Sequence, residues 1–427
     1  MIARPQMYSK RATLLLLFLL LPALSGSALA QSGNGKTSTP ATARLEELRA
    51  KGSEALFNLD YDSARQTFKE MARLFPDDPT GSQMLASTLW LETLNQARRL
   101  QAAIYSTQSF YAGTEDKPDP RLVQDFRDLT RQATQLAKAR LQRNPHDPQT
   151  LYTLGAIETL KASFAATLER RFIAALRDGS SGVDRHREVI KLDPNFHDAE
   201  LSIGLYDYIV GTLPLATKLV ASIVGARGSK KRGIETLERV AKEAHWEYDD
   251  ARVLLIGLYK REKRFPEALA VSRELQKKYP CNYLFRLETA DTLISQAVTE
   301  RQANRIKGAV ALETEAVSAF DLLLRERSAS GAPARALDLI HFRYGEALLL
   351  LGQPGYGAKE FLAATVVNGG EPGLVTRAHL RAAQALDLTG KRNEALTEYR
   401  IALSRPNIYD SLEQARRGLK EPYKQTK

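Results

Sequence analysis

The segment LEELRAKGSEALFNLDYDSARQTFKEMARLFPDD, residues 45–78, has the clearest structural pattern in this chain. Its apolar residues recur three or four positions apart, which predicts two amphipathic helices joined by the polar turn NLDYDS. Gly52 stands at the eighth position, where two helices can approach closely, and Ala64 and Phe68 stand at the twentieth and twenty-fourth. Pro76 follows and ends the second helix. We therefore expect an antiparallel helix pair.

The same spacing of small, large and proline residues returns farther along the chain. It marks the segments RFPEALAVSRELQKKYP (264–280), FRYGEALLLLGQPGYGAKEFLAA (342–364) and GKRNEALTEYRIALSRP (390–406). The pattern resembles the tetratricopeptide repeat (TPR). This resemblance implies an all-α fold, a right-handed superhelical solenoid of antiparallel helix pairs. The concave inner face of such a solenoid commonly binds extended peptides or other proteins.

The middle of the chain departs from this period. Pro145, Pro194 and Pro280 are not separated by whole repeats, which predicts longer helices or insertions there. The stretch GLYDYIVGTLPLATKLVASIVGARGSKKRGIETL (204–237) also resembles the core of the tetratricopeptide repeat protein 39 family, over roughly residues 196–285. That resemblance implies an atypical TPR array with a hydrophobic hairpin at its centre. It assigns no catalytic residue and leaves the ligand open.

The apolar part of this stretch, 206–224, has three interpretations. Asp207 and Lys218 are charged and Pro214 interrupts the helix, so a membrane span is disfavoured. Helices that are apolar on most faces are usually buried, which favours a place in the core. The alternative is an exposed surface that contacts a membrane or a partner.

A basic cluster follows the apolar stretch. Arg227, Lys230, Lys231 and Arg232 precede the helix expected over GIETLERVAKEA, and we interpret them as a solvated turn. Glycines and amide groups at a helix start can also bind an anion. A phosphate-binding P-loop is excluded because a helix, and not a strand, precedes the cluster.

The N-terminus has the pattern of a secretory signal. A basic start, a leucine-rich run and Ala28-Leu29-Ala30 predict a signal peptide over residues 1–30, with an uncleaved anchor as the alternative. A polar linker is expected over 31–42 and a repeat domain over 43–427. The protein is then exported, with a periplasmic location first and a secreted or outer-membrane-associated one as alternatives.

The net charge and the single cysteine indicate which partners to expect and whether the thiol has a role. The formal net charge is +11, which weakly favours acidic partners or an anionic membrane surface. The charge is not gathered into a stripe, so we expect no nucleic-acid binding. Cys281 is the only cysteine, and we expect it to be a small buried side chain.

The sequence contains no pattern typical of catalysis. None of the six histidines has metal-ligand spacing, and Glu247, Asp249 and Asp250 are interpreted as capping residues of an inter-helix turn. We expect no catalytic residues, no metal site, no cofactor and no enzyme activity. A hydrolase with a site assembled between repeats stays an alternative.

Aromatic residues are the best binding candidates. Tyr152, Tyr206, Tyr208 and Tyr344 lie on expected helices, and tyrosines on the concave face of a TPR array anchor peptides well. The alternative is that each fills a gap between helices. We interpret the chain as a non-catalytic scaffold or adaptor of the bacterial cell envelope with a protein or peptide partner. A membrane-associated component that uses the hairpin at 206–224 is the second interpretation, and the oligomeric state stays open.

Overall fold

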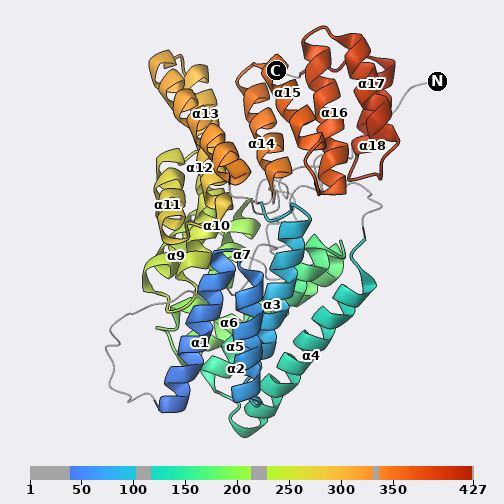
Figure 1. Cartoon of the computed structure of the whole chain (residues 1–427). Coiled ribbons are helices and arrows are strands. Elements are labelled where there is room, and N and C mark those ends of the chain that lie inside the picture. The colour runs from blue at the N-terminus through green and yellow to red at the C-terminus, as the bar shows by residue number, and fades with distance from the viewer. Residues whose placement is uncertain (1–38, 102–116, 213–227, 330–335, 426–427) are drawn as a thin grey trace, which may run out of the picture. The chain divides into compact units, whose positions relative to one another are not determined.

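The computed structural model describes residues 39–101, 117–212, 228–329 and 336–425 (Figure 1). Within these ranges every regular element is a helix, which confirms the all-α prediction. The helices form two compact units. Unit 1 contains the described residues 39–94 and 118–258, and unit 2 contains the remainder.

The helices of the first half of the chain are α1 (Pro40–Phe57), α2 (Tyr61–Leu74), α3 (Pro79–Gln96), α4 (Pro120–Arg143), α5 (Pro148–Thr167), α6 (Phe172–Leu192), α7 (Glu200–Thr212) and α9 (Lys230–Glu243), with a short 3-10 turn over His197–Ala199. Most begin directly after a residue whose side chain caps the first turn or with a proline in it. Helices α4, α5 and α6 have 24, 20 and 21 residues, against 14 in α2, which confirms the longer helices expected in the middle.

The pair of α1 and α2 forms as the sequence predicts. Asp60, in the turn, accepts a hydrogen bond from the Ser63 N–H at 3.1 Å and starts α2. A Cβ atom at Gly52 would lie 2.3 Å from Cε1 of Phe68, so glycine is required where the two helices touch. Ala64 and Phe68 are fully buried. The consensus positions of the repeat are therefore the packing positions of the pair.

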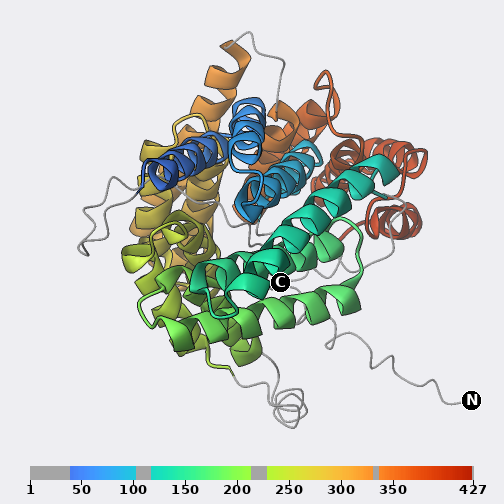
Figure 2. The ribbon, with the colours of Figure 1, turned by 90° about the horizontal axis from the view of Figure 1, so that it is seen from below.

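The helices of the second half are α10 (Tyr248–Arg261), α11 (Phe265–Lys278), α12 (Tyr283–Gln302), α13 (Ile306–Ala329), α14 (Leu337–Leu350), α15 (Pro354–Thr365), α16 (Pro372–Leu388), α17 (Arg392–Leu403) and α18 (Ser411–Lys420). Consecutive helices from α11 to α18 pack on one another. In addition α12 contacts α14, α14 contacts α16, and α16 contacts α18. Figures 1 and 2 show α14 to α18, coloured orange to red, side by side in both views.

This contact pattern is that of stacked TPR helix pairs, in which the first helix of each pair packs on the first helix of the next. We call α12, α14, α16 and α18, together with the last residues of α10 (259–261), the first helices of unit 2. Two glycines allow close approach: a Cβ at Gly345 would lie 2.8 Å from Phe361, and one at Gly418 would lie 2.2 Å from Tyr399. The right-handed superhelix stays a prediction.

The structure describes only residues 206–212 of the apolar stretch. Helix α7 packs on α9, and a Cβ at Gly233 would lie 2.5 Å from the backbone N of Tyr208. Leu205, Tyr208 and Ile209 are buried, as the core interpretation expects. The rest of the stretch, 213–224, lies outside the described residues. Among the helices that the structure describes, none is both long and apolar enough to cross a membrane.

The start of the first helix and the burial of Cys281 differ from expectation. Helix α1 begins at Pro40, within the linker expected over 31–42, and the signal peptide over 1–30 lies outside the described residues. The expectation for Cys281 is wrong, because its side chain is exposed. The residue stands in the turn before α12, where its neighbour Asn282 caps the helix by accepting the Leu284 N–H at 3.0 Å. Connections between helices run over the surface, and here the Cys281 side chain is exposed although its neighbour Asn282 is buried.

Candidate binding site

Ion pairs connect the first helices of unit 2. Each pair joins a base on one first helix to an acid on the neighbouring first helix, which we call the charge ladder. The ladder consists of Lys260 with Glu288 (Nζ to Oε2, 2.6 Å), Arg343 with Asp291 (Nε to Oδ2, 3.0 Å) and Arg381 with Glu346 (Nη2 to Oε2, 2.8 Å). Consecutive helix pairs are thus held together by charge as well as by apolar packing.

The ladder lies in a largely buried environment. Burial raises the pKa of Asp291 above its ordinary value, against the pull of Arg343. Burial acts in the same direction on Glu288, but Lys260 and Arg343 together hold the pKa of Glu288 below its ordinary value. Buried charges are tolerated only when each has an opposite partner, and the ladder meets that condition for its six members.

Arg377 is a cation on the same face without such a partner. It lies on α16, one turn before Arg381. Its guanidinium carbon stands 4.7 Å from the centroid of the Phe342 ring and 5.8 Å from that of Tyr409. Among the described residues it makes no hydrogen bond and no ion pair. Burial lowers its pKa, against the influence of Tyr409 and Glu346.

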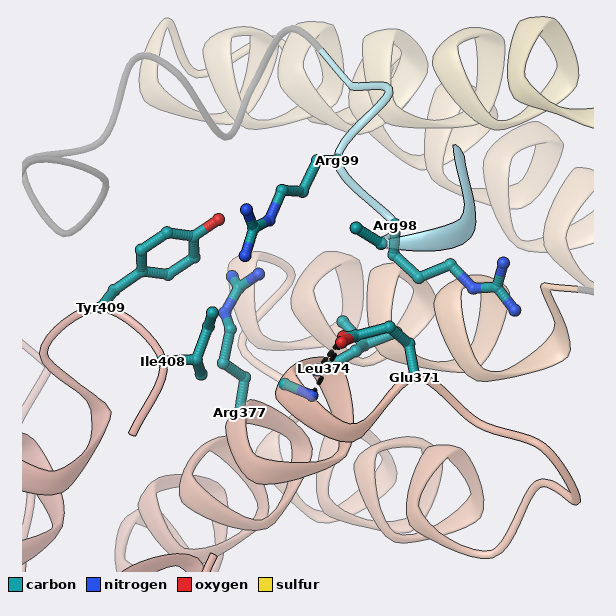
Figure 3. Close-up of a pocket in the computed structure, with 9 residues that line it drawn as sticks. Arg98, Arg99, Glu371, Leu374, Arg377, Ile408 and Tyr409 are labelled. Carbon is teal, nitrogen blue, oxygen red and sulfur yellow. Dashed lines mark hydrogen bonds between the residues drawn. The ribbon is translucent and has the colours of Figure 1, made fainter. Parts of the chain in front are cut away.

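A second arginine approaches from a distant part of the chain. Arg99 follows α3 and is 6% exposed, and its guanidinium carbon lies 5.8 Å from the Tyr409 ring centroid. Figure 3 shows the guanidinium groups of Arg99 and Arg377 pointing toward each other beside this ring. They line a small pocket, which we call the arginine pocket, formed by Ala97, Arg98, Arg99, Glu371, Gly373, Leu374, Arg377, Ile408 and Tyr409.

One buried carboxylate fixes the walls of this pocket. Asp338, at the start of α14, accepts Arg98 Nε at 2.9 Å and the Glu371 N–H at 2.9 Å. It therefore ties the segment after α3 to the turn that starts α16. Arg98 is directed away from the pocket in this pairing, whereas Arg99 is directed into it (Figure 3).

Glu371, the carboxylate that lines the pocket, already accepts hydrogen bonds from the backbone of α16. Glu371 caps α16 and accepts the N–H groups of Gly373 and Leu374, the first at 3.0 Å. It forms no ion pair with an arginine among the described residues. The positive charge of Arg377 is therefore not balanced from within the pocket. Planar guanidinium groups bind carboxylates and phosphates through paired hydrogen bonds, so the pocket has the chemistry of an oxyanion site.

The tyrosines singled out from the sequence lie elsewhere. Tyr152 and Tyr208, in unit 1, are buried, and Tyr152 donates a hydrogen bond to Glu247. Tyr344 is buried in unit 2, where its ring stacks on Phe320 at 4.8 Å between centroids and burial raises its pKa to about 12. These three side chains fill gaps between helices, as the alternative interpretation states.

Tyr206 and the basic cluster are more accessible. The Arg187 guanidinium carbon lies 4.8 Å from the centroid of the partly exposed Tyr206 ring. Lys230, Lys231 and Arg232 form the first turn of α9, so their interpretation as a turn before the helix is wrong. The helix starts earlier than expected because Ser229 caps it, accepting the Arg232 N–H at 3.3 Å.

The basic cluster is partly engaged within unit 1. Arg232 Nη2 lies 2.9 Å from Oδ1 of Asp207, and Lys231 Nζ lies 3.8 Å from Oε1 of Glu235. Arg227 lies outside the described residues. None of the described candidates taken from the sequence lines the arginine pocket.

Unit 1 contains a different arrangement, which we call the acid cluster. Asp198 accepts the backbone N–H groups of His245, Trp246 and Glu247 at 3.2, 2.6 and 2.8 Å. Glu247 and Asp250 lie beside this cap and are buried. The expectation that the acids at 247–250 cap a turn is therefore wrong for Glu247, because Asp198, from a distant segment, performs the capping.

Burial decides the ionisation of the acid cluster. It raises the pKa of Glu247 to about 8, and the charge of Asp198 adds to the rise, against the hydrogen bond from Tyr152. His186 stacks on Tyr152 at 5.2 Å, and burial lowers its pKa to about 4. No three His, Cys, Asp or Glu side chains in the described ranges are grouped so that they could hold a metal ion.

The sequence contains little signal for the arginine pocket. Arg99, Arg377 and Tyr409 are far apart in the chain, and 61 of the residues are Lys or Arg. Within the described part of the chain, Arg377 differs from the bases of the charge ladder in forming no ion pair, although the charge of Glu346 acts on it. That property is visible only once α14 and the turn before α18 are placed beside it. Sequence reasoning therefore selected four tyrosines and the basic cluster at 227–232, and it missed the arginines of the pocket.

No protein-family model matches the chain, and no curated protein matches it. Among solved structures it is similar to the human IFIT1 dimer with PPP-AAAA, at 11% identity over 90% of this chain and 86% of the other, with a TM-score of 0.45. Yeast Tom70 is similar at 11% identity, with coverages of 88% and 95% and a TM-score of 0.37. A thermophilic TPR protein of Thermus thermophilus, TTC0263, is similar at 16% identity, with coverages of 60% and 99% and a TM-score of 0.33.

Proposed function

We propose that this protein is a non-catalytic interaction scaffold that holds a segment of a protein partner against the first helices of unit 2. The observation that carries the proposal is the arginine pocket at the end of the charge ladder. The ladder satisfies the charges of the stacked helices internally, and the pocket adds one place where an outside group can complete them.

The stacked pairs supply the other property that a scaffold needs. Helices α12, α14 and α16 each pack on the second helix that follows and on a neighbouring first helix, so the side chains of the binding face are pre-positioned. A pre-organised surface loses less conformational entropy when it binds a flexible segment. We further propose that the protein acts in the cell envelope after export, on the signal pattern at 1–30.

Photo-cross-linking in intact cells tests this function. A photoreactive phenylalanine analogue replaces Tyr409 in the pocket or, as the matched control, Tyr356, which is 63% exposed on the second helix α15. We expect a discrete protein adduct from position 409 and none from position 356. Equal adducts at both positions, or none at either in a folded variant, contradict the proposal. Adducts of lipid or nucleic acid at position 409 contradict the choice of partner.

A further inference from the structure

We infer that the arginine pocket binds a carboxylate side chain of an acidic segment in the partner. This inference rests on the proposed function and names the chemistry of its ligand. Its starting point is the charge balance of the first helices α10 to α16.

The charge ladder uses every acid that it contains. Glu288, Asp291 and Glu346 each face a base on the neighbouring first helix, and Glu371 is held by the backbone N–H groups that begin α16. Arg377 is the base left over. Its contacts are two aromatic rings, which support a cation less strongly than an anion does.

The leftover charge cannot be removed by losing a proton. A guanidinium group stays protonated in proteins, even where burial lowers its pKa. Arg99 brings a second permanent cation to the same pocket (Figure 3). An anionic group in the pocket is attracted by the charge of Arg377, which no ion pair balances among the described residues. We therefore expect the pocket to bind an anion.

The lining of the pocket favours a carboxylate over a phosphate. A phosphate is typically bound by free N–H groups at a helix start as well as by arginines. Here Glu371 occupies those N–H groups of α16. Leu374 and Ile408 line the same pocket and offer apolar contact to the methylene groups of a glutamate side chain. The bases of the ladder are paired, so along its described length the ladder offers no continuous basic track for a nucleic-acid backbone.

The inference is tested by fluorescence anisotropy with the full chain and two labelled peptides of equal length. One alternates Glu with Ser and the other alternates Gln with Ser. We expect the Glu peptide to bind and the Gln peptide to bind at least tenfold more weakly. Arg377→Gln and Arg99→Gln are each expected to weaken binding of the Glu peptide at least tenfold.

The matched control is Arg400→Gln, which removes the same charge from an exposed position on α17, away from the pocket. It is expected to change the affinity less than twofold. Equal weakening by Arg377→Gln and Arg400→Gln would show attraction by net charge alone and overturn the inference. Circular dichroism measures whether each variant is folded. If Arg377→Gln is unfolded, Arg377→Lys replaces it in the comparison, and because this variant keeps the charge it is expected to retain part of the binding.

Competition identifies the anion. Displacement of the Glu peptide by free glutamate at lower concentration than by inorganic phosphate supports the carboxylate. The reverse order, or tighter binding of a single-stranded oligoadenylate of the same charge, overturns it. If position 409 still cross-links to a protein partner while Arg377→Gln leaves that adduct unchanged, the scaffold stands and only the carboxylate pocket fails.

Discussion

The acid cluster of unit 1 and the charge ladder of unit 2 solve the same physical problem in different ways. Both lie between packed helices, where water is excluded and an isolated charge is costly. In unit 1 the leftover group is an acid, Glu247, and in unit 2 it is a base, Arg377. Burial shifts the pKa of each toward its neutral form, upward for Glu247 and downward for Arg377.

The two groups differ in whether they can become neutral at physiological pH. Glu247, with a pKa of about 8, takes up a proton at neutral pH and needs no outside partner. Arg377 keeps its charge at any physiological pH. The buried acid is therefore accommodated within the protein, whereas the partly buried Arg377 is the group that we propose binds an outside anion.

The largest loss of stability is expected when Asp198, which accepts three backbone hydrogen bonds in unit 1, is removed. In Asp198→Ala the three N–H groups of residues 245–247 lose their acceptor inside the protein, and each costs about 1–3 kcal/mol. We expect the free energy of unfolding of unit 1 to fall by about 3–5 kcal/mol. Urea unfolding followed by tryptophan fluorescence measures it, since Trp90 and Trp246 both lie in unit 1. The exposed Asp184→Ala is the control, and a loss as small as the control's would contradict the role.

The second largest loss of stability is expected when one ion pair of the charge ladder is removed. Arg343→Met leaves Asp291 buried without its partner, and we expect the free energy of unfolding to fall by about 2–3 kcal/mol. The double variant with Asp291→Leu removes both charges and is expected to recover most of that loss. Urea unfolding followed by circular dichroism measures both. If the double variant is no more stable than the single one, the pair contributes through packing and not through charge.

The pH dependence separates the two units further. Glu247 has a folded pKa of about 8 against an ordinary value of 4.5, so the folded state binds its proton more tightly. The stability that it contributes is full below about pH 4.5 and is lost as the pH rises to about 8. His186, with a folded pKa of about 4 against 6.5, has the opposite slope between those two values.

The slopes of Glu247 and His186 cancel between about pH 4.5 and pH 6.5. Above that range Glu247 acts together with His245, because the hydrogen bond with Glu46 raises the pKa of His245 and the folded state binds that proton more tightly as well. We expect Glu247 to contribute a fall of about 1.4 kcal/mol per pH unit in the free energy of unfolding of unit 1 between about pH 6.5 and pH 8. Glu247→Gln is expected to remove this contribution and to leave that of His245. Urea titrations with tryptophan fluorescence at several pH values measure the slope, and a slope as steep in the variant as in the wild type refutes the assignment.

The smallest effect tests the contrast between paired and unpaired charges most directly. Arg377 and Arg381 lie one turn apart on α16, yet of these two only Arg381 has an acid partner among the described residues. Arg377→Met is expected to raise the free energy of unfolding by up to about 1 kcal/mol, because a costly charge is removed and the contacts with two aromatic rings remain. Arg381→Met is expected to lower it by about 2 kcal/mol. Thermal unfolding by circular dichroism compares them, and the same sign in both variants would remove the distinction.

The packing of the repeat followed from short-range patterns. Gly52 with Phe68, and Gly345 with Phe361, stand where a glycine opens a helix surface and an aromatic ring enters it. Such pairs recur at fixed spacing because each helix pair repeats the same geometry. The residues 143–148 and 191–196 end and start helices as expected, since prolines and Asp caps act within a few residues of themselves.

The proposed binding site did not follow from such patterns. The tyrosines were chosen because tyrosine is common at interfaces, but Tyr152 and Tyr344 face other helices and are buried. Which way a helical residue faces is set by the neighbouring pairs, and those neighbours lie tens of residues away. The arginine pocket needs three segments, after α3, within α16 and before α18, and no local spacing links them.

Local sequence was enough to predict the helices, their caps and turns, and the pairing of each helix with the next, because these depend on contacts between residues close in the chain. The packing of segments that are distant in the chain decides which charged side chains come into contact, and the sequence alone did not predict it. Whether Arg377 has a partner depends on what α14, the turn before α18 and the segment after α3 place around it. Coulomb energies are set by distance and burial, which spacing along the chain does not contain.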